Sequence, residues 1–322
     1  MKKRKLQIQI LLLITVILSV AACDALIAPT NGRENPNDPS NPVPIITDLS
    51  ISNITENSVT LSWTPQADTS GSYPSLLILS NTTAEPANTS DGTSVVDISL
   101  DETVLEQTIT DLTNSTTYYF SAWTYSEIDG ETVYTGPVSV SGQTYKERFT
   151  GSVQLDSDGY VDDMMMRYFA DPELFVGENF GMAEEYRTLV RFNNIPSNSV
   201  FLSANLIFYC ANSTLTSDQN IVVKNIIQLW DPAVIMWTTT DSVDFSESIA
   251  NGTQTISPGF NGTILFDVTD ALNTLKDGGA HYGFILYGPE ATAMDNYFQL
   301  VSIEDGGLPG PILNVDYYVL PD

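Results

Sequence analysis

The sequence predicts an all-β protein made of two tandem β-sandwiches. From residue 44 onward, short alternating segments rich in Val, Ile, Thr, Tyr and Phe are separated by clusters of Asn, Asp, Gly and Ser. In the segment 59–63, for example, Val59, Leu61 and Trp63 fall on one face of a strand. Many short strands with turn signals between them favour sandwiches over helical or parallel α/β folds. A chain of 322 residues is long enough to form two separate cores.

Residues 1–22 have the pattern of an export signal. Basic residues at positions 2–5 precede an apolar stretch that ends at Ala22, and this stretch is too short for a permanent membrane span. The small residues before Cys23 resemble the lipobox of bacterial lipoproteins. The resemblance implies that Cys23 is acylated, with palmitate among the lipids, and that the protein is anchored in the bacterial cell envelope. The outer membrane or cell surface is favoured, with the inner membrane as the alternative. An ordinary signal peptide with a chance cysteine is the other interpretation.

A flexible tether is predicted from Cys23 to residue 43. Prolines recur between residues 28 and 44, apolar anchors are few, and Asn, Asp and Ser fill the gaps. Such a composition cannot bury enough apolar surface to fold. The tether would hold the folded part of the chain away from the bilayer.

The charge balance restricts the partners of the protein. Four of the 12 basic residues lie in the signal, which leaves eight against 40 acidic residues in the mature chain. Such a surface repels nucleic acid and anionic lipid headgroups, so we expect no nucleic-acid partner. No later stretch of the sequence is long and apolar enough to span a membrane, so we expect membrane contact only through the lipid anchor.

The segment 44–146 resembles a fibronectin type III domain. Trp63 ends an early strand, as the core tryptophan of that family does. Tyr118 lies in a Leu-x-Asn-x-Thr-x-Tyr-x-Phe stretch that is similar to the family's approach to its tyrosine corner, and residues 136–144 resemble its last strand. The resemblance implies an immunoglobulin-like sandwich that acts as a spacer or binding scaffold, which indicates fold more than function.

The segment 147–322 resembles the DNRLRE domain, a jelly-roll-like β-sandwich grouped with carbohydrate-binding modules. The similar pieces are short but follow the order of that family, at residues 158–161, 174–177, 186–192, 202–209, 266–269 and 282–284. The resemblance implies a carbohydrate-binding-like role for this part of the chain. One short helix is expected to begin near Thr269 and to end before Gly278.

The sequence carries no enzyme motif, and we predict no catalytic residue. The patterns GxSxG, HExxH, CxxC and the P-loop are absent, and His281 is the single histidine. Chance carboxylate pairs are certain among 40 acidic residues, so hydrolysis by such a pair is only a weak third hypothesis. Cys210 lies in an apolar strand-like stretch, where we expect a buried thiol rather than a nucleophile.

Arg187 and Arg191 are the first candidates for glycan binding. On a strand they share a face with Leu189 and stand about 13 Å apart at roughly 3.3 Å per residue. We expect this face to point outward or to line a groove, where two guanidinium groups can bind the carboxylates of an acidic polysaccharide. The alternative is ion pairing with the protein's own acids. Tyr168 and Tyr282 are further candidates, which either stack on sugar rings or belong to the core and its rim.

Asp156, Asp158 and Asp162 belong to the densest acidic cluster of the sequence. Clustered carboxylates suit calcium, although the glycine that follows Asp158 does not fit the EF-hand spacing. A solvated acidic turn without a metal is the favoured interpretation, and calcium bound by the three carboxylates is the alternative. No other cofactor is indicated.

The leading hypothesis is a non-catalytic, lipid-anchored envelope protein that presents a carbohydrate-binding-like module to polysaccharides or cell-surface glycans. The alternative is a structural or adhesion lipoprotein with no sugar site. An exposed aromatic or arginine platform in the second domain favours the first hypothesis. A smooth acidic surface without a groove favours the second.

Overall fold

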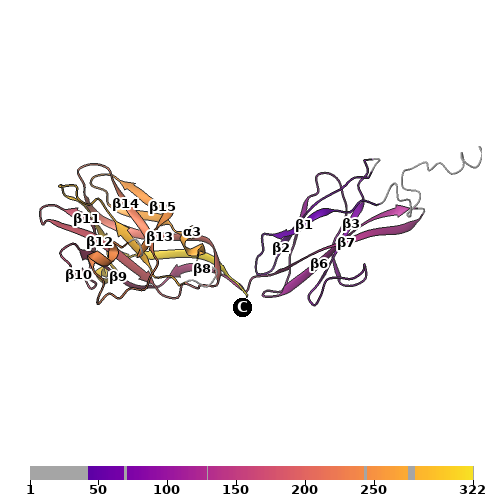
Figure 1. Cartoon of the computed structure of the whole chain (residues 1–322), viewed down its shortest axis with the longest axis horizontal. Coiled ribbons are helices and arrows are strands. Elements are labelled where there is room, and N and C mark those ends of the chain that lie inside the picture. The colour runs from indigo at the N-terminus through magenta and orange to yellow at the C-terminus, as the bar shows by residue number, and fades with distance from the viewer. Residues whose placement is uncertain (1–42, 69–70, 129, 243–244, 275–279, 322) are drawn as a thin grey trace, which may run out of the picture. The chain divides into compact units, whose positions relative to one another are not determined.

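The chain folds into two compact units, the first ending at Thr144 and the second beginning at Tyr145 (Figure 1). The computed structural model describes residues 43–68, 71–128, 130–242, 245–274 and 280–321. The expected signal peptide, the expected lipid site at Cys23 and all but the last residue of the expected tether lie outside these ranges. Within the described ranges, no helix combines the length and the apolar character needed to cross a membrane.

The first unit is a sandwich of two antiparallel sheets. Its strands are β1 (Thr47–Ser52), β2 (Val59–Thr64), β3 (Ser75–Asn81), β4 (Thr93–Ser99), β5 (Glu106–Ile109), β6 (Thr117–Ile128) and β7 (Glu131–Gln143). One sheet has the strand order β1-β2-β5, and the other has the order β4-β3-β6-β7. The apolar faces of the two sheets enclose one core, which includes Val59, Leu61 and Phe120.

Trp63 and Tyr118 lie as expected from the sequence. Trp63 is buried in the core of the first unit and donates its indole N–H to the carbonyl oxygen of Val104 at 3.1 Å. The backbone N–H of Thr113 donates to the hydroxyl oxygen of Tyr118 at 2.9 Å. This bond ties the start of β6 to the connection before it, which is the geometry of a tyrosine corner.

The second unit is a single twelve-stranded antiparallel sheet that curls around its own core. Its strands are β8 (Glu147–Val153), β9 (Leu155–Asp162), β10 (Arg167–Tyr168), β11 (Glu173–Asn179), β12 (Glu184–Phe192), β13 (Ser199–Thr214), β14 (Gln219–Ile226), β15 (Ser246–Ile256), β16 (Gly262–Asp267), β17 (Phe284–Tyr287), β18 (Asn296–Val301) and β19 (Ile312–Val319). The main path of neighbours is β15-β14-β17-β12-β11-β18-β13-β19-β8. Strand β16 is joined to β13, and β9 joins β10 to β12. The all-β prediction is confirmed for both units.

The long strand β13 allows the sheet to close on itself. Its first part pairs with β19 and its last part with β18, while residues between them also pair with β16 on the opposite edge. The register of β13 against β18 shifts between Cys210 and Asn212. Such a bulge bends a strand and increases its twist. One continuous sheet can therefore supply both layers around a core.

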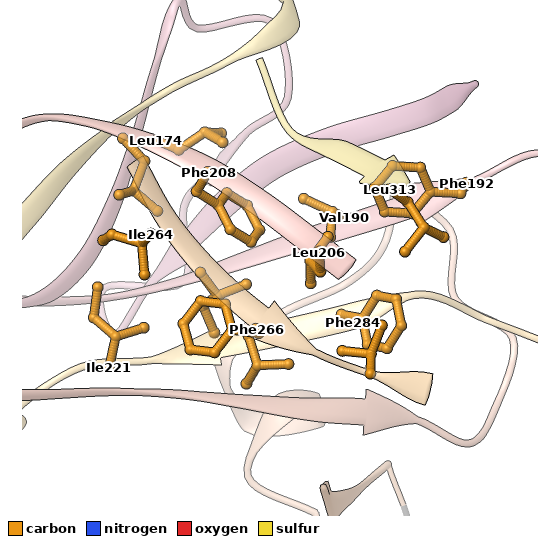
Figure 2. Packing of buried hydrophobic residues seen from close by; sticks show 14 of the residues in the cluster. Leu174, Val190, Phe192, Leu206, Phe208, Ile221, Ile264, Phe266, Phe284 and Leu313 are labelled. Atoms are coloured by element: carbon orange, nitrogen blue, oxygen red, sulfur yellow. The ribbon is translucent and has the colours of Figure 1, made fainter. Parts of the chain in front are cut away.

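The core of the second unit is packed with aromatic and branched side chains from opposing strands (Figure 2). Phe208, Phe266 and Phe284 are fully buried within it. Cys210 is also fully buried and donates its S–H to the carbonyl oxygen of Asn212 at 3.1 Å. Burial raises the pKa of the Cys210 thiol to about 11. The expectation of a buried thiol is confirmed.

The described residues of the second unit also form three short helical segments: α2 (Trp237–Thr240), α3 (Thr269–Asn273) and the 3₁₀ turn η1 (Ile303–Asp305). Helix α3 begins at Thr269, as the sequence predicts. Ala271 and Leu272 anchor it in the main core.

Candidate binding cleft

A second apolar layer lies on the outer face of the sheet in the second unit. Along β12, Val190 and Phe192 point into the main core, whereas Leu189 points to the opposite face. The outer cluster contains Val161, Leu189, Ile226, Trp230, Ile235, Trp237, Phe245 and Ile285. Three of these residues, Trp230, Ile235 and Trp237, lie in the chain that directly follows β14. Residues 227–242, which we name the cover segment, therefore pack over the outer face of the sheet.

Arg187 lies beneath the cover segment and is almost fully buried, with 5% of its surface exposed. Its Nε and Nη2 atoms donate to the two carboxylate oxygens of Glu290, each at 2.8 Å. Its Nη1 atom donates to Asp241 at 2.8 Å and to Thr240 at 3.0 Å. The guanidinium carbon stands 3.7 Å from the ring centre of Trp237. Arg187 does not face outward, because the cover segment packs over it, and its bonds to Glu290 and Asp241 match the alternative of ion pairing with the protein's own acids. It also lines a pocket of about 470 Å³ at the edge of the cover segment.

Arg191 lies at the other end of the same strand face and is only partly enclosed, with 24% of its side chain exposed. Its Nε atom donates to Asp156, and its Nη1 atom donates to the carbonyl oxygen of Trp230 at 2.9 Å. Its guanidinium carbon lies 5.1 Å from the ring centre of Trp230. Among the described residues, none accepts a hydrogen bond from its Nη2 atom. The Nη2 atom of Arg191 is therefore able to donate a hydrogen bond to a ligand.

Arg191 opens into a cleft of about 490 Å³ beside the cover segment. The cleft is lined by Arg191, Gln228, Leu229, Trp230, Asp231, Pro232, Val234, Ile235, Thr239 and Phe245. Its shape depends on a turn at Asp231, whose carbonyl oxygen accepts the backbone N–H groups of Val234 and Ile235 at 3.0 Å and 2.9 Å. The indole N–H of Trp230 donates to the carbonyl oxygen of Tyr282 at 2.6 Å and fixes the base of the turn.

The cleft combines polar groups with exposed apolar side chains. Gln228 and Asp231 are exposed, and Thr239 is half-buried. Leu229 and Val234 are 75% and 62% exposed, which is unusual for such large apolar residues. Sequence reasoning missed these five residues. The available signal was the apolar stretch from residue 226 to 230, which has no strand alternation and runs directly into a proline turn.

Tyr168 and Tyr282 take separate places in the second unit. Tyr282 packs against the outer cluster next to Trp230, so it stands near the cleft. Tyr168 packs against the main core instead, where it stacks on Tyr160 with ring centres 4.4 Å apart and donates its hydroxyl to Asp162 at 3.2 Å. The structure therefore brings Tyr282 and Arg191 to the same end of the sheet but does not add Tyr168 to them.

The three aspartates considered for calcium have separate partners. Asp156 pairs with Arg191, and Asp162 accepts the backbone N–H of Met166 at 2.7 Å. Asp158 accepts the hydroxyl of Ser302 at 3.3 Å and the backbone N–H of Ile303 at 3.0 Å. Across the described ranges, no three His, Cys, Asp or Glu side chains are grouped so that they could hold a metal ion. The three carboxylates therefore form no common site, because each fixes a different contact. The favoured interpretation of a solvated acidic turn is wrong, because Asp158 and Asp162 are buried in strand β9.

A buried aspartate, Asp158, and a half-buried histidine, His281, lie near the cleft end of β12. Burial, followed by the neighbouring carboxyl group of Glu304, raises the pKa of Asp158 to about 7. Burial lowers the pKa of His281 to about 4. The Nε2 atom of His281 is inaccessible and has no hydrogen-bond partner in the described part of the chain, while the residue as a whole is half-buried.

Comparison with known proteins identifies the first unit. Residues 44–140 match the family model of the fibronectin type III domain. The chain therefore contains a fibronectin type III domain that is followed by a further β-rich domain. No curated protein matches the sequence.

Several solved structures resemble parts of the chain at low identity. A segment of two fibronectin type III domains from chicken tenascin is 14% identical over 46% of this chain and 90% of its own, with a TM-score of 0.22. A chitinase from Bacillus thuringiensis is 15% identical over 82% of this chain and 29% of its own, with a TM-score of 0.25. An α-L-rhamnosidase from Dictyoglumus thermophilum is 10% identical over 85% of this chain and 27% of its own, with a TM-score of 0.27. The chain thus spans less than a third of either enzyme.

Proposed function

We propose that this protein is a non-catalytic, lipid-anchored component of the bacterial cell envelope that binds an acidic polysaccharide through the second unit. The binding site in this proposal is the cleft beside Arg191, with Tyr282 near its base. The fibronectin type III domain serves as a spacer, and the second unit is the DNRLRE-like carbohydrate-binding module that its sequence resembles. The observation that carries the proposal is the unused Nη2 donor of Arg191 at the wall of an open cleft.

The lining of the cleft suits a sugar chain. A pyranose ring presents apolar C–H faces and polar hydroxyl edges, so it needs a site with both kinds of surface. Leu229 and Val234 supply exposed apolar surface, while Gln228, Asp231 and Thr239 supply hydrogen-bonding groups. Ligand sites typically combine an apolar lining with a few polar groups that fix orientation. A cleft of about 490 Å³ has room for a short stretch of a polysaccharide.

Arg191 selects an acidic sugar in this proposal. A guanidinium group binds carboxylates with charge-assisted hydrogen bonds, and uronic acids carry such a carboxylate on each residue. The large excess of acidic residues in the chain opposes an anionic polymer at long range. Salt screens this repulsion more than it weakens a close contact in a partly enclosed cleft. Binding is therefore expected to strengthen when moderate salt is added to dilute buffer.

Affinity electrophoresis of the full chain in detergent tests the sugar site. We expect a gel containing polygalacturonate to retard the protein, and a gel containing neutral dextran to leave its mobility unchanged. Arg191→Ala should weaken the retention at least about tenfold, equivalent to about 1.4 kcal/mol. Arg148→Ala is the matched control, because Arg148 is an exposed arginine of the second unit that pairs with Asp316 away from the cleft. If the wild type is not retarded at any salt concentration, the sugar-binding proposal is wrong, and the alternative is a structural lipoprotein without a sugar site.

The anchor is tested separately at Cys23. We expect Cys23→Ala to move the protein into the aqueous phase of a detergent phase separation, since no other part of the mature sequence is apolar enough to hold it in a bilayer. Equal recovery of variant and wild type with the membranes would rule out lipid attachment at this cysteine. This outcome would leave the sugar site unaffected.

A further inference from the structure

Three loops of the second unit expose an unusual group of apolar side chains. They connect β9 to β10, β11 to β12, and β17 to β18. Five of the seven methionines of the chain lie in these loops. Their exposed residues, which we name the methionine surface, are Met164, Met165, Met166, Phe180, Met182 and Met294, each between 44% and 65% exposed. Apolar side chains gathered in this way on adjoining loops indicate an interaction site.

Hydrogen bonds between the loops hold the methionine surface together. The backbone N–H of Gly181 donates to Asp295 at 3.0 Å and joins the second loop to the third. The backbone N–H of Glu185 donates to Asp163 at 3.1 Å and joins the first loop to the start of β12. The carboxylate of Glu185 in turn accepts the backbone N–H of Ala291 at 2.7 Å. The three loops therefore form one fixed platform at one end of the second unit.

The platform is strongly acidic around its apolar side chains. The carboxylates in or beside the loops are those of Asp162, Asp163, Glu178, Glu184, Glu185, Glu290 and Asp295. Arg167 is exposed beside the first loop, and Arg187 is already paired with Glu290 underneath. The net charge around the methionine surface is thus negative even after both arginines are counted.

Charge and chemistry together define the partner. Methionine side chains are flexible and polarizable, so they adapt to apolar surfaces of different shape. An acidic rim attracts a cationic partner and discriminates against an anionic one. A second copy of this chain and an anionic lipid surface are both disfavoured, because the chain carries a formal charge of −28. The partner with both matching properties is a basic segment that also carries apolar side chains.

We propose that the methionine surface is a docking site for a cationic, amphipathic segment of another protein. Apolar side chains of the segment pack against the thioethers, while its Lys and Arg residues face the surrounding carboxylates. This site is separate from the Arg191 cleft and does not depend on the sugar-binding proposal.

Fluorescence anisotropy with two labelled peptides tests the docking site on the full chain. One peptide consists of Leu and Lys in an amphipathic pattern, and the other has Ser in place of every Leu at the same charge and length. Charge alone would bind both peptides equally. We expect the Leu/Lys peptide to bind at least about tenfold more tightly, a difference of about 1.4 kcal/mol, and both affinities to fall as salt is added.

The triple variant Met164→Ser, Met182→Ser, Met294→Ser should abolish the preference for the Leu/Lys peptide without lowering the melting temperature, since all three side chains are exposed. The matched control is Leu202→Ser, Leu265→Ser, Leu308→Ser, which removes three apolar side chains of the same unit that are 49%, 46% and 44% exposed. The control should keep the preference. Equal binding of the two peptides to the wild type, or an unchanged preference in the methionine variant, would overturn the proposal. Sedimentation velocity that shows a dimer dissociated by the methionine variant would instead assign the surface to self-association.

Discussion

Arg187 and Arg191 lie on the same face of one strand, four residues apart, and the structure uses them in opposite ways. Arg187 has all of its donor atoms engaged and is covered by Trp237. Arg191 lines a cleft, and its Nη2 atom has no acceptor among the described residues. The difference arises from the cover segment. Its residues 237–241 close over Arg187, whereas Arg191 is met by Trp230 just before the segment turns at Asp231. The comparison teaches that strand alternation decides the face of a side chain but not whether this face meets solvent.

Trp63→Ala is expected to lower the free energy of unfolding more than any other substitution proposed here. Because Trp63 lies in the first unit, this variant is the reference for the arginine variants of the second unit. Removal of this buried indole from the first unit should lower its free energy of unfolding by about 3–5 kcal/mol. If the two units unfold independently, the second unit should keep its own transition in denaturant. Loss of both transitions together would mean that the arginine variants cannot be interpreted within one unit.

Arg187→Ala should destabilise the second unit by about 3 kcal/mol. Removal of one partner from a buried ion pair leaves the carboxylate of Glu290 without its bidentate donor and takes away the contact with Trp237. The estimate is at the low end for buried pairs because Asp241 is 60% exposed and can be solvated again. Urea unfolding of the full chain measures the loss, with Arg187→Lys as the variant that keeps the charge. A stable Arg187→Ala protein would show that the cover segment holds without its arginine.

Arg191→Ala should cost less than about 1 kcal/mol, because its pair with Asp156 is partly solvated. The same variant is expected to lose binding to polygalacturonate. The two arginines therefore differ in what each substitution changes: stability at position 187 and binding at position 191. A large destabilisation by Arg191→Ala would remove this distinction and would make the cleft a structural feature only.

Acid titration should show a small net effect, because two groups at the cleft end change the stability in opposite directions. The pKa of His281 is about 4 in the folded protein against an ordinary 6.5, so the unfolded chain takes up its proton first. His281 therefore contributes stability that is lost as the pH falls from about 6.5 toward 4. The raised pKa of Asp158, about 7 against 3.8, means that the folded protein is protonated first. Asp158 therefore contributes in the reverse direction, with stability gained as the pH falls from about 7.

The variants His281→Gln and Asp158→Asn separate these two contributions. Relative to the wild type, His281→Gln should lose less stability between pH 6.5 and 4, and Asp158→Asn should lose more. Melting temperatures of the second unit across this range provide the measurement. Parallel curves for the wild type and both variants would show that neither group titrates differently in the folded and unfolded states.

The sequence predicted best those features that depend on neighbouring residues. The class of both units, the core position of Trp63 and the corner at Tyr118 follow from local alternation and from short motifs. The burial of Arg187 could not be predicted in this way, because its partner Thr240 lies 53 residues further along the chain. Strand alternation placed Arg187 and Arg191 correctly on one face. Whether a later segment would cover this face depends on tertiary packing, which local patterns do not contain.

Burial of Cys210 offers a way to follow the second unit alone. Apart from Cys23, the expected lipid site, Cys210 is the only cysteine of the sequence. Cys210 is fully buried with a raised pKa, so in the acylated protein a thiol reagent can react with it only after the curled sheet opens. The rate of labelling at a fixed reagent concentration then measures how often the native sheet opens under conditions where the protein remains folded. The labelling rate of Cys210 can thus be compared between the wild type and each arginine variant, without denaturant and with the neighbouring domain still attached.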